Sequence, residues 1–69
     1  MGYAIQINAY ADWERTYFVQ GYDETEAVRK AYDMFRGTMS CVLPDTLEEA
    51  LKSNGIWIDI RACVDQIIL

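Results

Sequence analysis

Residues 23–36 read DETEAVRKAYDMFR, and this stretch decides the fold because its period differs from that of the segments on either side. Asp23 can cap a first helical turn, and Glu26 three residues later can complete a capping box. The apolar positions follow the i, i+3, i+4, i+7 spacing of one helix face: Val28, Ala31, Tyr32 and Phe35. The pattern predicts a helix that starts after Asp23 and has Gly37 as its C′ residue.

Two stretches before this helix and one after it have the two-residue period of strands. Residues 3–9 alternate, so one face of the first strand would carry Tyr3, Ile5, Ile7 and Ala9. Residues 15–20 are rich in β-branched and aromatic side chains, and the short connection at residues 11–14 makes the two strands an antiparallel hairpin. Residues 56–64 predict a third strand, whose apolar face would carry Ile56, Ile58, Ile60, Ala62 and Val64.

The segment between the long helix and the last strand is less regular. Residues 38–43 form either a short extra strand or a loop that packs Met39, Val42 and Leu43 against the core. A second, shorter helix is predicted to open at Pro44 and Asp45 and to end at Asn54 and Gly55. Two capping boxes are possible, Thr46 with Glu49 or Asp45 with Glu48. The apolar side of this helix would consist of Leu47, Ala50 and Leu51.

These elements predict a single α+β domain over residues 1–69, in the order strand, strand, helix, short helix, strand. A three-stranded, mainly antiparallel sheet with one long and one short helix on one face would bury every apolar stripe at once. The other face of the sheet would carry Gln6, Asn8, Trp57, Asp59 and Arg61. A sheet face that bears a tryptophan and has no second layer in the chain favours the binding of a partner.

The chain is acidic, since 11 carboxylate and 6 basic side chains give a net charge of −5. This charge repels nucleic-acid phosphates and anionic membranes, and it favours a basic protein surface, although it is also an ordinary charge for solubility. The sequence has no apolar run of about 18 residues, as a membrane span needs, and no secretory signal is expected. We therefore expect a cytoplasmic protein in which Cys41 and Cys63 are reduced thiols rather than a disulfide.

The residue types that catalysis usually needs are missing from the sequence. There is no histidine, which is the commonest general base and metal ligand. The two cysteines form no CxxC motif, and neither GxGxxG nor GxxxxGK[ST] is present. The grouped carboxylates stand where helix starts need caps, and Cys63 has no histidine or lysine neighbour that would lower its pKa. We expect a protein that is not an enzyme and binds no metal or cofactor.

Three surfaces besides the sheet face are candidates for binding a partner. The hairpin connection presents Asp12, Trp13 and Glu14, although the indole could instead fold back over a sheet edge. The second surface is acidic and would imitate a row of phosphates, unless its carboxylates only cap and solvate the helices: Asp23, Glu24, Glu26, Asp45, Glu48 and Glu49. The third is the aliphatic C-terminus, Ile67, Ile68 and Leu69, which either extends the last strand along its own sheet or pairs with a second copy as a homodimer.

Two segments of the chain resemble small proteins that phages use to switch off host machinery. Residues 21–32 read GYDETEAVRKAY and open the helix after the two short strands, and residues 56–64 read IWIDIRACV. This outline resembles small anti-CRISPR proteins, which combine a short sheet with one or two helices. It is also similar to small phage inhibitors of host RNA polymerase, whose helix start and last strand resemble residues 24–27 and 61–64. Residues 38–55, with their second helix, depart from the polymerase-inhibitor outline.

The resemblance implies a non-enzymatic inhibitor in the host bacterial cytoplasm. Such a protein would occupy a basic nucleic-acid-binding surface of a host protein or ribonucleoprotein complex, using carboxylates and one or two aromatic side chains. On this hypothesis the partner-binding residues include Trp57 and Asp59 of the sheet face together with the hairpin and helix-start residues above. The alternative is a small dimeric accessory domain that packs against its own copy or a neighbouring subunit.

Overall fold

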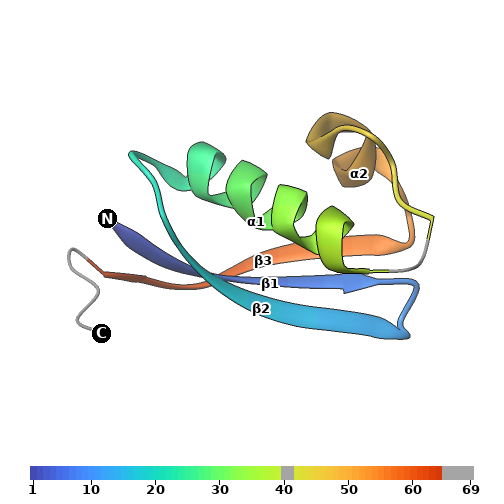
Figure 1. Ribbon diagram of the computed structural model, residues 1–69, viewed down its shortest axis with the longest axis horizontal. Helices are drawn as coiled ribbons and strands as arrows, with labels where there is room; N and C mark the ends of the chain where they lie inside the picture. Colours follow the sequence, from blue (N-terminus) through green and yellow to red (C-terminus); the bar gives the residue numbers. More distant parts are fainter. Residues whose placement is uncertain (40–41, 65–69) are drawn as a thin grey trace.

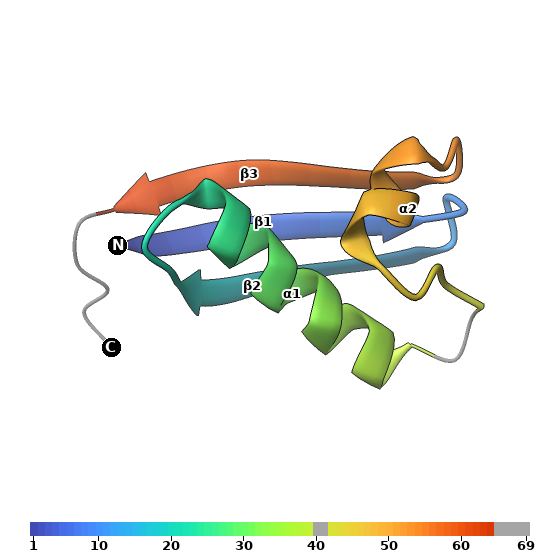
Figure 2. The same cartoon turned by 90° about the horizontal axis from the view of Figure 1, so that it is seen from above.

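The computed structural model describes residues 1–39 and 42–64 of the chain. The elements are β1 (Gly2–Ala9), β2 (Trp13–Gln20), α1 (Glu24–Thr38), α2 (Leu47–Lys52) and β3 (Ile56–Val64). The strands form an antiparallel sheet in the order β2-β1-β3. Both helices lie on one face of this sheet, with α1 crossing it diagonally and α2 near the end that carries the β1–β2 hairpin (Figures 1 and 2). The predicted α+β architecture and element order are confirmed.

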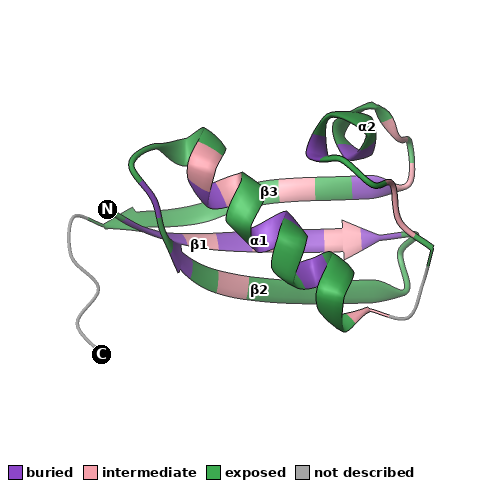
Figure 3. Cartoon of the chain, turned by 45° about the horizontal axis from the view of Figure 1, so that its top comes forward, coloured by how far each residue is buried: buried purple, intermediate pink, exposed green. Residues whose placement is uncertain are grey.

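The hydrophobic core lies between the sheet and α1. One face of β1 is buried as predicted, through Tyr3, Ile5, Ile7 and Ala9. The predicted helix face packs onto it through Ala27, Ala31, Tyr32 and Phe35, while Val28 is only half-buried (Figure 3). Phe35 also meets Tyr17 of β2 edge to face, with ring centroids 6.5 Å apart.

Side chains and backbone cap both ends of α1. The Glu26 N–H donates to Asp23 Oδ1 at 2.9 Å, so the predicted N-cap is confirmed. The Glu26 carboxylate accepts from the N–H of Tyr22, one residue before the cap. Gly37 is helical rather than C′, because the helix continues to Thr38 and has Met39 as its C-cap, whose N–H donates to Phe35 O at 3.0 Å. The Thr38 hydroxyl also donates to the Met34 carbonyl at 3.0 Å.

The hairpin is tighter than predicted, because Trp13 and Glu14 already belong to β2. Its turn places Tyr10 and Ala11 at φ values of 58° and 61°, in the left-handed region that non-glycine residues rarely adopt. Tertiary contacts hold Tyr10 there: its N–H donates to Gly55 O at 2.6 Å and its hydroxyl to Val42 O at 2.9 Å. Local sequence rules cannot predict a turn that depends on such distant contacts.

The connection into α2 is a loop in the part that is described, and Met39 and Leu43 pack against the core as predicted. Val42 was expected there too, but it is 87% exposed. Of the two residues predicted to cap α2, Thr46 is the N-cap, because its Oγ1 accepts a hydrogen bond from the N–H of Glu49. Leu51 points outward and is 60% exposed, so its assignment to the buried side of α2 was wrong.

A β-bulge in β3 changes which side chains share a face. Ile5 pairs with Ile60 and Ala4 with Ala62, which leaves Arg61 without a partner in β1. One extra residue reverses the alternation beyond it, so Ala62 and Val64 lie on the face opposite to Ile60, contrary to the prediction.

The same shift brings Cys63 beside Tyr3 on the helix-covered face. Burial, and then the neighbouring Cys63 thiol, raise the pKa of the Tyr3 phenol. Among the residues described, no helix is both long enough and apolar enough to span a bilayer.

Candidate binding surfaces

The sheet face opposite the helices, which we call the open face, has no other layer of the described chain packed against it (Figure 1). Strand pairing defines its members, because residues directly opposite each other in an antiparallel pair point to the same side. From β2 it contains Glu14, Thr16 and Phe18; from β1, Ala4, Gln6 and Asn8; from β3, Trp57, Asp59, Ala62 and Val64. The predicted members Gln6, Asn8, Trp57 and Asp59 are therefore brought together.

Two exposed aromatic residues stand on this face in different outer strands. Phe18 of β2 is 73% exposed and Trp57 of β3 is 66% exposed. They lie in different rows, since Phe18 pairs with Ala4 and Trp57 with Asn8. At about 3.3 Å per residue along a strand, these rows are roughly 13 Å apart. Phe18 did not figure among the predicted site residues, although its place in the alternation of β2 identifies it.

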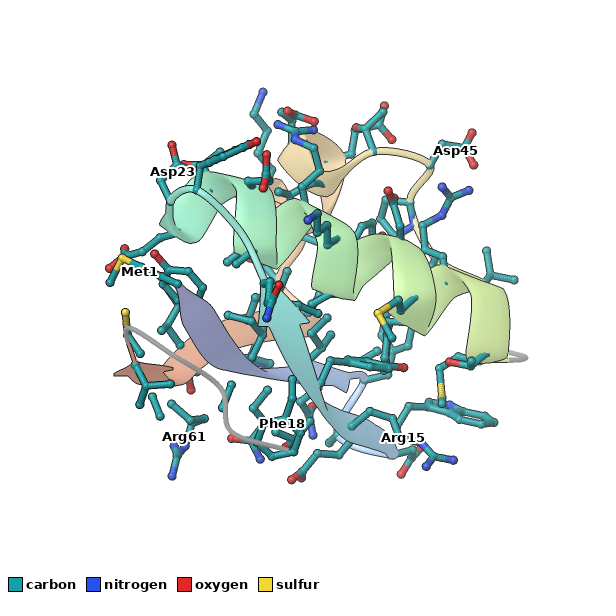
Figure 4. The ribbon with its side chains drawn as sticks, turned by 60° about the vertical axis from the view of Figure 1, so that its left-hand side comes forward. Met1, Arg15, Phe18, Asp23, Asp45 and Arg61 are labelled. Carbon is teal, nitrogen blue, oxygen red and sulfur yellow. The ribbon has the colours of Figure 1, made fainter. Side chains whose placement is uncertain are left out.

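A polar row separates the two aromatic side chains. Thr16, Gln6 and Asp59 face one another across the three strands, and the Gln6 amide donates to the Glu14 carboxylate. Figure 4 shows Phe18 and Arg61 pointing away from the side of the sheet that α1 covers. The open face thus combines two carboxylates with separated aromatic groups, and the unpaired Arg61 points to the same side.

The hairpin residues do not act as one cluster. Trp13 is the first residue of β2 and pairs with the buried Ala9, so its indole belongs to the helix-covered side. Glu14 is on the open face, and Asp12 is exposed in the turn. Trp13 and Glu14 therefore point to opposite faces of the sheet, as adjacent strand residues do, and the Trp13 side chain remains 37% exposed.

The acidic helix starts are partly neutralised by cations of α1. Glu26 pairs with Lys30 at 3.5 Å, Asp45 with Arg36 at 3.4 Å and Glu48 with Arg29 at 2.7 Å. The hydrogen bond from Arg29 lowers the pKa of Glu48, and the same bond raises the pKa of Arg29. Asp23 is the N-cap of α1, Glu24 is in its first turn and Glu49 is in the first turn of α2. Basic side chains therefore interrupt the carboxylates that were predicted to imitate phosphates.

An apolar groove on the helix side was not predicted from the sequence. It has a volume of about 320 Å³ and lies between α1, α2 and β3. The polar residues of its lining are Glu24 and Thr25. The other lining residues are aliphatic: Val28, Leu47, Leu51, Ile58 and Ile60. The outward direction of Leu51 opens this groove, and that direction depends on how α2 docks rather than on the local pattern.

Within residues 1–39 and 42–64, no cluster of three or more His, Cys, Asp or Glu side chains is placed to hold a metal ion. Cys63 is exposed, whereas Cys41 falls outside the described residues. The predicted self-association residues Ile67, Ile68 and Leu69 also lie outside them. Comparison of the chain with protein-family models, curated proteins and solved structures gave no match.

Proposed function

We propose that this chain is a non-enzymatic protein that docks the open face of its sheet onto a basic surface of a nucleic-acid-handling host complex and thereby inhibits it. The exposure of Phe18 and Trp57 on that face carries the proposal. Aromatic side chains dominate the energetics of protein interfaces, and burying apolar surface yields about 25 cal/mol per Å². A partner that covers both rings therefore gains affinity from groups that the chain itself leaves in water.

The charges around these rings support a basic partner. Asp59 lies in the row between Phe18 and Trp57, and Glu14 stands in the same row as Trp57. Arg61 is the one basic side chain that the described part of β3 adds on that side. Two copies docked face to face would gather four carboxylates and only two guanidinium groups, which is a costly arrangement in a desolvated interface. The net charge of −5 also attracts a basic surface over longer range.

The helix-start carboxylates have a smaller role in this proposal than the sequence suggested. Glu26, Asp45 and Glu48 each have an intramolecular cation within ion-pair distance, and a partner cation would have to compete with it. The proposal therefore places the main determinants on the open face. The acidic helix side contributes steering of the encounter, which changes the association rate more than the affinity.

The test is capture of a complex from bacterial lysate by the tagged chain, followed by a nucleic-acid-binding assay on the captured complex. We expect salt-sensitive capture of a complex that loses its DNA or RNA when the chain is added. The charge swap Glu14→Lys with Asp59→Lys should weaken capture at least tenfold. The matched swap Asp33→Lys with Glu49→Lys, on the helix side, should change it little.

An aromatic pair of variants provides a second, independent readout. Phe18→Ser should reduce capture strongly. The control Tyr22→Ser also removes an exposed aromatic ring, from a residue outside the sheet that is 92% exposed, and it should leave capture unchanged. If both charge swaps weaken capture equally, or if the captured complex keeps its nucleic acid, the proposal is wrong. A salt-resistant dimer that captures nothing would favour the accessory-domain alternative.

A further inference from the structure

β3 is an edge strand, and no described residue pairs with its outer side along its regular half. Within residues 1–39 and 42–64 its pairing partner is β1, and Figure 2 shows it at the border of the sheet. The bulge at Ile60 to Ala62 disturbs the far half of the strand, which leaves residues 56–60 as a regular edge. This half contains neither proline nor lysine, the residues that commonly prevent an edge from pairing with another chain.

The apolar groove lies over this same half of β3, on the helix side. Ile58 and Ile60 line it together with Leu51 of α2 and Val28 of α1. Ile60 is 38% exposed and Leu51 is 60% exposed, so the described residues do not fill the groove. In a strand added beside β3, every second side chain would point toward this groove.

The intervening side chains of an added strand would point to the open face. Asp59 points to this face too, because it lies between Ile58 and Ile60 in the strand. Glu24 stands at the rim of the groove. Neither carboxylate is within ion-pair distance of a cation in the part of the chain that the structure describes. The free edge is therefore flanked by aliphatic side chains on one face and by a carboxylate on the other.

We propose that an extended segment of a basic protein adds to the sheet as a fourth strand beside residues 56–60. Its sequence pattern is apolar–Lys/Arg–apolar, with the apolar side chains in the groove and the basic one beside Asp59. This mode of recognition combines main-chain hydrogen bonds with pockets for alternate side chains. The inference deepens the function proposed above and rests on it in taking the partner to be a basic protein.

A second copy of the chain fits this edge less well. If two β3 strands paired antiparallel around Ile58, Asp59 of each copy would lie opposite Trp57 of the other, with no cation beside either carboxylate. A basic segment offers a charge partner at the same position. Charge complementarity therefore favours a heterologous segment over self-association.

The test uses a fluorescein-labelled peptide in which valine alternates with arginine, and it measures binding by fluorescence anisotropy. We expect saturable binding that falls at least tenfold with Asp59→Arg. The same variant should acquire binding to a matched peptide in which valine alternates with glutamate. The control Asp33→Arg makes the same change of charge on an exposed residue of α1, and it should leave the preference for the arginine peptide in place.

Two further probes separate strand addition from a general attraction of charges. Leu51→Gln makes the groove wall polar at an exposed position and should weaken binding several-fold. N-methylation of the peptide nitrogens that face β3 should abolish binding, because it removes the main-chain donors. Equal binding of the methylated peptide, or equal losses in Asp59→Arg and Asp33→Arg, would overturn the inference.

Measurement of mass in solution completes the test. A stable two-chain species that excludes the peptide would overturn the inference in favour of a second copy at this edge. Peptide binding by a chain that captures no nucleic-acid-handling complex would support strand addition and count against the target proposed above. The two proposals can therefore fail separately.

Discussion

Both faces of the sheet carry large apolar side chains, but these are buried on the face that the helices cover and exposed on the open face. On the helix-covered face, Ile5 and Ile7 of β1 have no exposed surface, whereas Phe18 on the open face of β2 is 73% exposed. The difference comes from coverage, because α1 and α2 both pack on one side. The comparison shows that one face stabilises the fold and leaves the other free to bind, so that substitutions on the two faces should affect different properties.

The largest expected effect comes from the matched pair Phe35→Ala and Phe18→Ala. Phe35 is fully buried, and its truncation should cost about 3–5 kcal/mol of unfolding free energy, which is most of the stability of a domain this small. Phe18→Ala should leave stability nearly unchanged. Urea denaturation measures both, and Phe35→Leu, with a smaller expected loss, keeps the comparison measurable if Phe35→Ala does not fold. Similar losses for Phe35→Ala and Phe18→Ala would refute the division between the faces.

A smaller effect is expected where α1 holds the segment that leads into α2. The Tyr32 hydroxyl donates to Pro44 O at 2.7 Å, and burial raises the pKa of this phenol, which keeps the donor protonated. Tyr32→Phe should lower the unfolding free energy by about 1 kcal/mol. Thermal denaturation can compare it with Tyr17→Phe, whose hydroxyl meets the Thr38 hydroxyl at an exposed site and should matter less. A larger loss for Tyr17→Phe would contradict this assignment.

The hairpin turn joins strands that contribute to both faces, and it allows a stabilising substitution. Ala11 has φ of 61°, where glycine avoids the steric cost of a Cβ atom. Ala11→Gly should therefore raise the unfolding free energy, by about 0.5–1 kcal/mol. Ala4→Gly, in the middle of β1, should lower it by a similar amount. Chemical denaturation of the two variants should give shifts of opposite sign.

The smallest effect concerns the exposed ion pair between Arg29 of α1 and Glu48 of α2. Because Glu48 has a lowered pKa when folded, its contribution is complete above the ordinary glutamate value, about 4.3, and is lost as pH falls through the folded pKa. The stability difference between the wild type and Glu48→Gln should therefore shrink on acidification. High salt should reduce it too, since both side chains are exposed. A difference that grows at low pH would show that the pair is not its source.

Local sequence rules predicted the elements whose signals are local. The caps at Asp23 and Thr46, the alternation of β1 and the apolar face of α1 all followed from spacing, because capping and amphipathicity depend on residues a few positions apart. The open face and four of its polar and aromatic members also followed from alternation. Phe18 could have been added by the same argument.

The features that the sequence missed depend on contacts between distant residues. The left-handed turn at Tyr10 and Ala11 is supported by Gly55 and Val42, and the bulge at Arg61 is defined only by the register against β1. The interruption of the acidic row by Arg29 and Arg36 requires α2 and the segment before it to lie within ion-pair distance of α1. No periodicity within one segment reports such pairings.

The sequence by itself thus determined the α+β class, the element order and the acidic character of the chain, since propensity, period and charge are properties of neighbouring residues and composition. The tertiary structure decided which carboxylates are paired, which side chains beyond the bulge change face, and where an apolar groove opens beside β3. Those outcomes depend on the docking of α1 and α2 on the sheet, where packing across long sequence separations outweighs local preference.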